Sequence, residues 1–321
     1  MLEEIDSNPK LSVVSTLYQS SNHIDEFYSR LVACCSKLTE SFEIILVNDG
    51  ATDDSLEKAK VIADYDPRVT VIDLSRNFGH HKAMMVGLAY CKGERIFLID
   101  SDLEESPELL LQFSNSLDEN SDLDMVYGIQ KKRKGGFFER VSGTLFYRTV
   151  NSLVDIPIPE NFLTVRLMTR RFVKELCRYE ERELNFSTLI ALCGFRSKAI
   201  AVHKGHKQQT SYTIGKKFQI LVNTITSASS KPLWIIFVSG LLITTVSIIT
   251  IFYILFEYIF HGIGLAGWTS LIVSIWLLGG LLIMSVGTIG IYLSKIFIEV
   301  KQRPYVNIRE VIKRREPNDE Y

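Results

Sequence analysis

The stretch RIFLIDSDLEE, residues 95–105, decides the fold of this chain. Its first half is apolar and β-branched, and its second half is acidic, with Asp100 and Asp102 at alternate positions. The apolar half is typical of a strand buried on both faces of a parallel sheet that helices cover. In such sheets, ligands bind beyond the carboxyl ends of the strands. The acidic half therefore lies where we expect a ligand.

Four other stretches have the same apolar composition and are separated by segments of helical length. We expect strands over LSVVSTLY (11–18), EIILVN (43–48), VTVIDL (69–74) and DMVYGI (124–129), and helices over 23–38, 54–64 and 80–91. Strands that alternate with helices predict an α/β fold with a mainly parallel, Rossmann-like sheet. The strand over 43–48 also ends in a polar turn, Asn48-Asp49-Gly50, which we expect at the same edge of the sheet as the acidic stretch.

The acidic stretch offers ligands for a metal ion. Asp100 and Asp102, with Glu104 as a third group, present the hard oxygen atoms that suit Mg²⁺ or Mn²⁺ bridging a diphosphate. Two aspartates alone are weak evidence, because Asp is common in turns and at helix N-caps. The adjacent His80 and His81 are not expected to bind a metal together, since neighbouring side chains on a helix project about 100° apart.

Two segments near the C-terminus, 233–256 and 268–293, carry no charged residue. Each is longer than the ~20 residues that an α-helix needs to cross a bilayer. Two core helices of a soluble protein are the alternative, but a domain of this size has little room to bury runs of this length. Glycines in the second segment suit close helix packing in a membrane. We therefore predict two transmembrane helices.

The residues that flank these segments predict their orientation. The connector between them contains no Lys or Arg, whereas basic residues precede the first segment and follow the second: Lys216, Lys217, Lys231, Lys295, Lys301 and Arg303. By the positive-inside rule, both termini lie in the cytosol, in a multi-pass protein of the inner (plasma) membrane. The N-terminal region shows no signal-peptide pattern, so we expect the α/β domain in the cytosol.

These signals divide the chain into six parts. We predict a cytosolic catalytic domain (1–215), an amphipathic juxtamembrane helix (216–232), a first transmembrane helix (233–257), a short external connector (258–267), a second transmembrane helix (268–294) and a cytosolic tail (295–321).

The overall charge excludes one class of function. Lys and Arg number 36 against 37 Asp and Glu, so the chain has no basic excess of the kind that nucleic-acid binding requires. The mean hydropathy of +0.12 is high for a chain with 23% charged residues, and the two uncharged segments account for it. The five cysteines form no CxxC pair, and in a reducing compartment we interpret them as small apolar residues.

Longer motifs extend along nearly the whole chain. They are NDGATDDS (48–55), LSRNFGHHKAMMVGL (74–88), DSDLEESPELL (100–110), YGIQKKRKG (127–135), FYRTVNSL (146–153), RLMTRR (166–171) and GIYLSKIFIEVKQRPY (290–305). In this order and spacing they resemble the inverting GT-A glycosyltransferases, and more narrowly the polyprenyl-phosphate glycosyltransferases. That branch includes the bactoprenol glucosyltransferases and, more distantly, the dolichol-phosphate mannose synthases.

The resemblance implies roles for particular side chains. It assigns nucleotide-sugar binding to Thr16, Tyr18, Asp49, Arg76, Asp100 and Ser101, and a Mg²⁺ or Mn²⁺ ion to Asp100, Asp102 and Glu104. It assigns the acceptor phosphate to Lys132, Arg133, Lys207, Ser211 and Tyr212, and catalysis to Asp102, Arg133 and Arg166. Alternatives remain open, namely a turn-forming role for Asp49, a structural ion pair for Arg76, and a solvated surface for the basic residues.

The chain departs from the family pattern at several positions. Thr16 replaces a Pro, Gln19 replaces an Asn, and Asn48 replaces the first Asp of a DDGS motif. Thr164 stands where relatives have the Asp of DFRLM, so a base at that position is missing unless Glu160 supplies it. The metal carboxylates are present, which indicates a divergent enzyme and not an inactive one.

The expected reaction transfers a sugar from a nucleotide sugar, by family leaning a UDP-sugar, to undecaprenyl phosphate or another polyprenyl phosphate, with inversion. A lipid phosphate is already ionised near neutral pH, so cations that position it matter more than a strong base. The product would serve modification of a cell-surface polysaccharide or lipid, and the resemblance implies a homo-oligomer such as a tetramer.

Two alternatives to this reaction stay open. The first is transfer to a lipid-linked glycan or a glycolipid, and the second is a non-catalytic membrane scaffold or transport component. The motifs do not encode which sugar is transferred.

Overall fold

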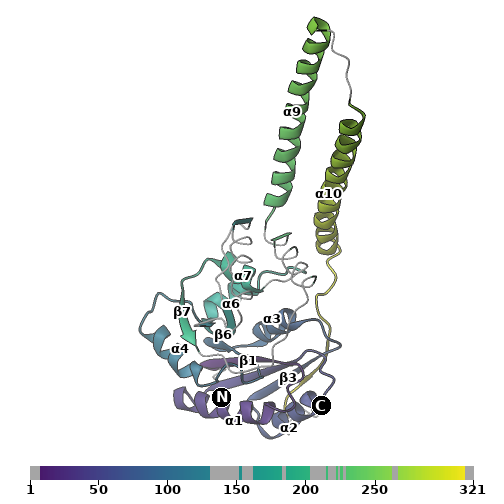
Figure 1. Cartoon of the computed structure of the whole chain (residues 1–321). Coiled ribbons are helices and arrows are strands. Elements are labelled where there is room, and N and C mark those ends of the chain that lie inside the picture. Colours follow the sequence, from purple (N-terminus) through teal and green to yellow (C-terminus); the bar gives the residue numbers. More distant parts are fainter. Residues whose placement is uncertain are drawn as a thin grey trace. The chain divides into compact units, whose positions relative to one another are not determined.

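Strands and helices alternate along the first half of the chain as the sequence predicts. The computed structural model describes residues 8–130, 152–153, 162–182, 186–202, 215, 222, 225–226, 229–261 and 267–314. Their elements are β1 (Leu11–Leu17), α1 (Ile24–Leu38), β2 (Phe42–Asn48), α2 (Ser55–Tyr65), β3 (Val69–Leu74), α3 (His80–Tyr90), β4 (Arg95–Leu98), α4 (Leu109–Asp118), β5 (Met125–Gln130), β6 (Phe162–Thr169), α6 (Arg170–Leu176), α7 (Phe186–Cys193), β7 (Ser197–Val202), α9 (Lys231–His261), α10 (Trp268–Val300) and β8 (Ile308–Ile312) (Figure 1). The five predicted strands and three predicted helices are confirmed.

The strands form one eight-stranded sheet in the order β7-β5-β6-β4-β1-β2-β3-β8. β1 pairs in parallel with both β2 and β4, β2 pairs in parallel with β3, and β5 does so with β7. β6 is antiparallel to β4 and β5, and β8 is antiparallel to β3. Every strand except β6 and β8 therefore runs in the same direction. The predicted mainly parallel, Rossmann-like sheet is confirmed.

Helices cover both faces of this sheet, as Figure 1 shows. The side chains of α1, α2 and α4 pack in one apolar core, and those of α3, α6 and α7 pack in a second. Neighbouring residues of one strand enter opposite cores: Val13 and Ile44 lie in the first, and Val14 and Ile45 in the second. A strand with two buried faces is apolar at most positions, which explains why these stretches have no regular polar-apolar alternation.

The last strand, β8, was not predicted. It follows α10 in the chain and pairs with the outer edge of β3, with Val311 opposite Ile72 and Glu310 opposite Asp73. Its sequence, IREVI, is short and holds two charged residues, so it carries little of the β-strand signal that a sequence search uses. Part of the predicted C-terminal tail is thus a strand of the α/β unit. Residues 303–314 belong to the same compact unit as the rest of the sheet.

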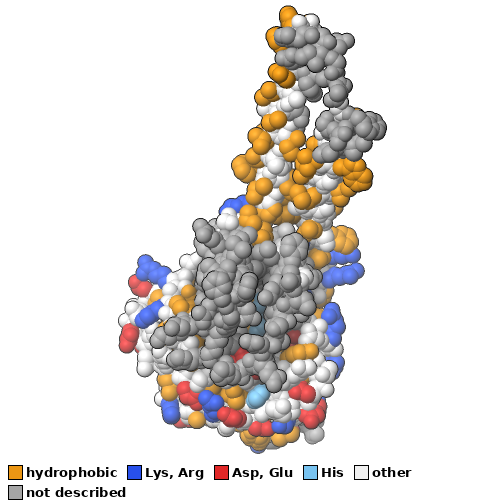
Figure 2. Space-filling view, viewed as in Figure 1, with side chains coloured by type: hydrophobic (Ala, Val, Ile, Leu, Met, Phe, Trp, Pro, Cys, Tyr) orange, Lys and Arg blue, Asp and Glu red, His pale blue; other side chains and the backbone are white. Residues whose placement is uncertain are grey.

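The second unit of the chain contains α9 and α10. Within the described residues, 231–250 and 274–300 are long and apolar enough to cross a membrane by length and composition. Large apolar side chains such as Phe237 and Trp276 are exposed along both helices. Figure 2 shows many orange side chains along the two helices. Within this unit, the Tyr292 hydroxyl donates a hydrogen bond to the Ser229 carbonyl at 2.7 Å. The two predicted apolar helices are therefore present.

Arg30 ties α1 to the residue that precedes α4. Its Nε and Nη2 atoms donate to the two carboxylate oxygens of Glu108 at 3.0 and 2.7 Å. These bonds lower the pKa of Glu108 from 4.5 to about 2, against the opposing effect of burial. The ionised carboxylate therefore contributes stability that is present above about pH 4.5 and is lost as the pH falls towards 2.

We predict that Glu108→Gln lowers the stability at neutral pH by up to about 1 kcal/mol, because the pair is half-exposed. The stability of this variant should also change less between pH 4.5 and 2 than that of the wild type. Urea unfolding followed by circular dichroism over this pH range measures both effects. Glu57→Gln, in the exposed pair with Lys60, is the control and should match the wild type. If the stability of Glu108→Gln depended on pH as that of the wild type does, the lowered pKa of Glu108 would be contradicted.

Candidate active site

The site lies where the order of the strands reverses. β2 and β3 follow β1 on one side, whereas β4 lies on the other side of β1. In α/β sheets, ligands bind beyond the carboxyl ends of the strands at this reversal. All the described residues with a predicted donor or metal role lie at or just after the ends of β1 to β4: Thr16, Tyr18, Asp49, Arg76, Asp100, Ser101, Asp102 and Glu104.

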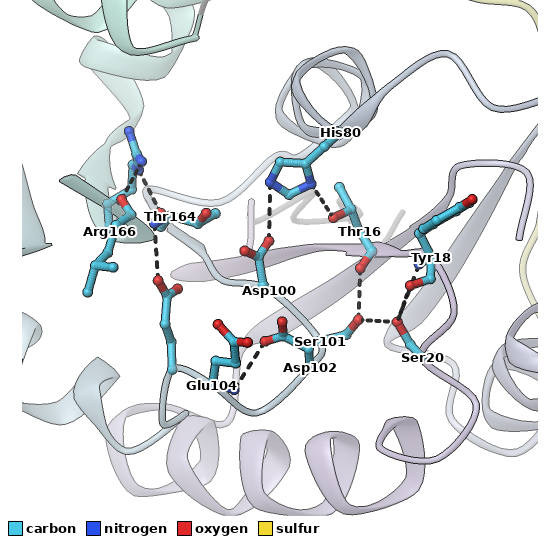
Figure 3. Close-up of polar contacts among 12 residues, drawn as sticks. Thr16, Tyr18, Ser20, His80, Asp100, Ser101, Asp102, Glu104, Thr164 and Arg166 are labelled. Carbon is cyan, nitrogen blue, oxygen red and sulfur yellow. Dashed lines mark hydrogen bonds and ion pairs between the residues drawn. The ribbon is translucent and has the colours of Figure 1, made fainter. Parts of the chain in front are cut away.

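His80, the first residue of α3, bridges the ends of β1 and β4 (Figure 3). Its Nδ1 lies 3.1 Å from the Thr16 hydroxyl, and its Nε2 lies 3.4 Å from a carboxylate oxygen of Asp100. A neutral imidazole that donates from Nε2 to Asp100 and accepts from Thr16 satisfies both contacts. The neighbouring His81 ring instead lies 6.3 Å from the ring of Phe186. Sequence reasoning considered His80 only as half of a metal pair and missed this role.

Ser101 points away from the site and holds its two strand ends together. Its side chain is buried and donates to the Thr16 carbonyl at 2.8 Å, and its oxygen lies 2.7 Å from the Ser20 hydroxyl. Asp100 and Asp102, on either side of the buried Ser101, both stay partly exposed. The predicted role of Ser101 in binding the nucleotide sugar remains untested, but its hydroxyl is committed to this internal contact.

The loop that follows is bent by its own carboxylate. An oxygen of Asp102 accepts a hydrogen bond from the Glu104 backbone N–H at 3.1 Å, and Leu103 between them has a φ of +57°. A left-handed Leu is unfavourable, so the surrounding contacts must hold it there, and its side chain packs against the first core. Within the described part of the chain, no three His, Cys, Asp or Glu side chains form a group that could hold a metal. Asp100, Asp102 and Glu104 therefore do not converge as a complete ligand set.

Glu105 connects this loop to β6. It is buried, and its Oε1 accepts a hydrogen bond from the Thr164 backbone N–H at 3.2 Å. Thr164, at the position where the family pattern has an Asp, thus lies beside a carboxylate that comes from another part of the sequence. No local signal in the sequence singled out Glu105, because it reads as one more acid in an acidic run.

Arg166, predicted to be catalytic, is only 2% exposed. Its Nε and Nη2 donate to the carbonyls of Thr164 and Leu163 at 2.7 and 2.8 Å, and its guanidinium lies over the rings of Phe162 and Phe186 at 4.4 and 4.8 Å. Burial lowers the pKa of Arg166 to about 9, and nearby carboxylates oppose this shift. Its Nη1 has no hydrogen-bond partner among the described residues. The Arg166 side chain is therefore buried in the protein and packs against backbone carbonyls and aromatic rings.

Asp49 shapes the loop between β3 and α3. Its two carboxylate oxygens accept hydrogen bonds from the backbone N–H groups of Phe78 and Gly79 at 2.7 and 3.1 Å. Burial raises the pKa of Asp49, and these two bonds oppose the shift. Arg76, in the same loop, is exposed, and its guanidinium lies 4.1 Å from the centre of the Phe78 ring. The hydrogen bonds of Asp49 therefore favour a structural role in which it fixes the loop backbone, whereas the side chain of Arg76 is accessible to a ligand.

Other predicted site residues divide into two groups. Tyr18 lies directly after β1 with half of its surface exposed, so its ring is accessible at the edge of the site. The predicted acceptor residues lie outside the described residues, as does the alternative base: Lys132, Arg133, Lys207, Ser211, Tyr212 and Glu160. The predicted juxtamembrane helix also lies largely outside them.

Comparison with known families identifies the class of this chain as a glycosyltransferase. Residues 12–177 match the model of glycosyl transferase family 2, which is more than half of the chain and spans β1 to α6. The protein belongs to this family. The resemblance predicted from the motifs is therefore confirmed.

Relatives extend the similarity over the two long helices. A protein of Mycobacterium tuberculosis named as a glycosyltransferase is 46% identical over 302 residues, which cover 94% of this chain and 88% of the relative. A prophage bactoprenol glucosyl transferase homolog of Escherichia coli K12 is 28% identical over 95% of this chain and all of the relative. Among solved structures, a mannosyltransferase from Pyrobaculum calidifontis in complex with GDP-Man and Mn²⁺ aligns with a TM-score of 0.43 and 16% identity, over 61% of this chain and 56% of that one.

Gly50 lets the end of β2 pack directly against the loop after β3. Its φ is +63°, and a Cβ atom there would lie 2.4 Å from the Asn77 backbone nitrogen. Gly194 has almost the same φ, +66°, but a Cβ atom there would meet nothing closer than 3.9 Å. An alanine at either position would strain the backbone, but only an alanine at Gly50 would also clash with neighbouring atoms. Comparing the two substitutions therefore separates the free-energy cost of the backbone conformation from that of the clash.

We predict that Gly194→Ala costs about 1 kcal/mol, because only the left-handed backbone is strained. Gly50→Ala should cost about 1–3 kcal/mol more, because the loop backbone must also move. Chemical unfolding of both variants measures the difference. Equal stability of the two variants would show that the loop does not pack on Gly50 as described.

Proposed function

We propose that this protein transfers a sugar from a nucleotide sugar to a polyprenyl phosphate, with inversion at the anomeric carbon. The observation that carries the proposal is the pair of partly exposed carboxylates, Asp100 and Asp102, at the strand reversal of a glycosyl transferase family 2 sheet. The same chain carries two long apolar helices, and a relative aligned over its whole length is named bactoprenol glucosyl transferase homolog. A polyprenyl phosphate lies in a membrane, so two apolar helices would bring the site to this acceptor.

The carboxylates fit a divalent cation that is shared with a diphosphate. Mg²⁺ in such sites is held by one or two carboxylates together with substrate phosphate oxygens, so a complete protein cage is not needed. Asp100 and Asp102 would provide these ligands, with Glu104 beside them. A bound Mg²⁺ or Mn²⁺ would offset the charge that develops on the leaving diphosphate. The donor would be a UDP-sugar, with Thr16, Tyr18 and Arg76 at its nucleotide side.

The acceptor phosphate would act as the nucleophile without losing a proton. One of its oxygens forms the new bond to the anomeric carbon as the bond from that carbon to the donor diphosphate breaks. An ionised phosphate needs positioning more than a base, which is consistent with Thr164 in place of an Asp. Basic residues would hold the acceptor phosphate, and we propose for this role Lys132, Arg133 and Lys207, with Ser211 and Tyr212.

We further propose that α9 and α10 cross the membrane. Their exposed Phe, Trp, Ile and Leu side chains form an apolar surface far larger than the patches that monomeric soluble proteins tolerate in water. In this arrangement the α/β domain stays on the side where the basic flanking residues lie, which by charge is the cytosol. The assembly would be a homo-oligomer of the inner membrane.

We predict that Asp102→Asn lowers the rate of sugar transfer by about 100-fold or more, because an amide is a weaker ligand for the cation. The assay incubates the full-length protein with Mn²⁺, undecaprenyl phosphate and a panel of radiolabelled UDP-sugars, and measures label in the organic extract. Asp64→Asn, an exposed residue of α2, is the control. Unchanged turnover by Asp102→Asn would refute the metal assignment. A product that resists mild acid would instead indicate a glycolipid or lipid-linked glycan acceptor.

His80 offers a second test, since it contacts the carboxylate of Asp100. Groups that orient a metal ligand typically change metal affinity, so His80→Ala should weaken Mn²⁺ binding by about tenfold or more. Electron paramagnetic resonance of free Mn²⁺ measures this affinity without any turnover. His81→Ala, the adjacent histidine, is the matched control and should bind Mn²⁺ as the wild type does. Equal affinities in the two variants would rule out an orienting role for His80.

A further inference from the structure

We propose that Arg309 of β8 is a positioning residue of the donor site, which holds the first residue of the loop 75–79 while Asp49 holds the last two. This inference rests on the proposed function, because the loop matters for the donor only if Arg76 and His80 act there. Arg76 lies in the loop, and His80 directly follows it. Arg309 itself touches neither donor nor acceptor in this proposal. It acts through the loop backbone and through Asp73.

The C-terminal segment binds the first residue of the loop at both of its backbone groups. The Ser75 N–H donates to the Asn307 carbonyl at 2.9 Å, and the Ser75 carbonyl accepts from Nη2 of Arg309 at 2.8 Å. Ser75 directly follows β3, so these bonds determine the direction in which the chain leaves the sheet. The loop therefore starts from a position that β8, more than two hundred residues away in sequence, defines.

A second set of contacts links Arg309 to the turn that carries Asp49. Nη1 of Arg309 contacts one oxygen of the Asp73 carboxylate at 3.1 Å, and the Asn48 side-chain N–H donates to the other at 2.8 Å. The side-chain oxygen of Asn48 in turn accepts from the Ala51 N–H at 3.2 Å. This arrangement explains why Asn48 replaces the Asp of the family motif. A carboxylate at position 48 would face the buried carboxylate of Asp73 and repel it.

Arg309 is 59% exposed at its side chain, and an isolated pair with that exposure contributes little. Two features set this pair apart. The Asp73 side chain is only 4% exposed, so its negative charge depends on nearby donors and cations. The guanidinium also donates from two separate nitrogens, Nη1 to a carboxylate and Nη2 to a carbonyl, whereas a lysine would have to reach both acceptors from one nitrogen.

The loop is thus held at both ends. Asp49 binds the N–H groups of Phe78 and Gly79 at its far end, whereas Arg309 and the segment before it bind Ser75 at its near end. Loss of Arg309 should loosen the near end, where of the two Ser75 bonds only the one to the Asn307 carbonyl would remain, while the far end stays attached. The expected result is a looser loop and weaker donor binding, with the rest of the sheet and the acceptor side unchanged.

Three variants of the full-length protein test this: Arg309→Ala, Arg309→Lys and, as the matched control, Arg314→Ala, an exposed arginine just beyond β8. Hydrogen exchange of the amides in 75–79 reports on the loop, and exchange in β1 and β4 verifies that each variant is folded. Calorimetry with UDP and Mn²⁺ measures donor-side affinity, and transfer assays give separate KM values for donor and acceptor.

We expect Arg309→Ala to speed exchange in 75–79 and to raise the Kd of UDP by about three- to tenfold, as for coupled contacts between neighbouring residues. The donor KM should rise with it while the acceptor KM stays constant. Arg309→Lys should recover part of the effect, and Arg314→Ala should match the wild type.

If hydrogen exchange in 75–79 were the same in Arg309→Ala as in the wild type, the proposal would be overturned. This outcome does not depend on which sugar the enzyme transfers. Faster exchange with unchanged UDP affinity would also overturn it, because the loop would then have no role on the donor side. A wild-type protein that binds no nucleotide would refute the proposed donor class, and the exchange data would still decide whether Arg309 holds the loop.

Discussion

The parallel pairing of β1 with β4 is the constraint on which the candidate site depends. These strands lie side by side although two strands and three helices separate them in sequence. Their ladder continues past the ends of the strands, since the Ile99 N–H bonds the Val14 carbonyl at 3.1 Å and the Ser101 hydroxyl bonds the Thr16 carbonyl at 2.8 Å. The acidic loop therefore leaves the sheet at a fixed distance from the end of β1 and from His80, which contacts both.

Buried polar groups at the strand ends impose a second constraint. Most buried polar atoms find a hydrogen-bond partner, and for Asp49 and Glu105 the partners are backbone groups of neighbouring segments. Asp49 binds the backbone after β3, and Glu105 binds the backbone of β6. Side chains that look like ligands in the sequence thus divide by burial. Some shape the loops, and others, such as Asp102 and Arg76, remain accessible to a substrate.

Local pattern was sufficient for much of the fold. Continuous apolar runs and helical segments predicted β1 to β5 and α1 to α3, because a strand buried on both faces needs no knowledge of its partners to be recognised. The same holds for α9 and α10, whose uncharged length is a property of the segment alone. It did not hold for β7 and β8, which are the two edge strands of the sheet, or for β6, an interior strand whose direction only its pairing with β4 and β5 determines.

The sequence by itself determined the family, the two apolar helices and the strand-end positions of the acidic residues, because these follow from composition and spacing along the chain. Only the tertiary structure decided which of those residues face a ligand. It placed His80 against Asp100, buried Arg166 against two phenylalanine rings, and brought Arg309 to Asp73. The physical reason is that such contacts join residues far apart in the chain, so their geometry depends on how the strands pair and not on any local pattern.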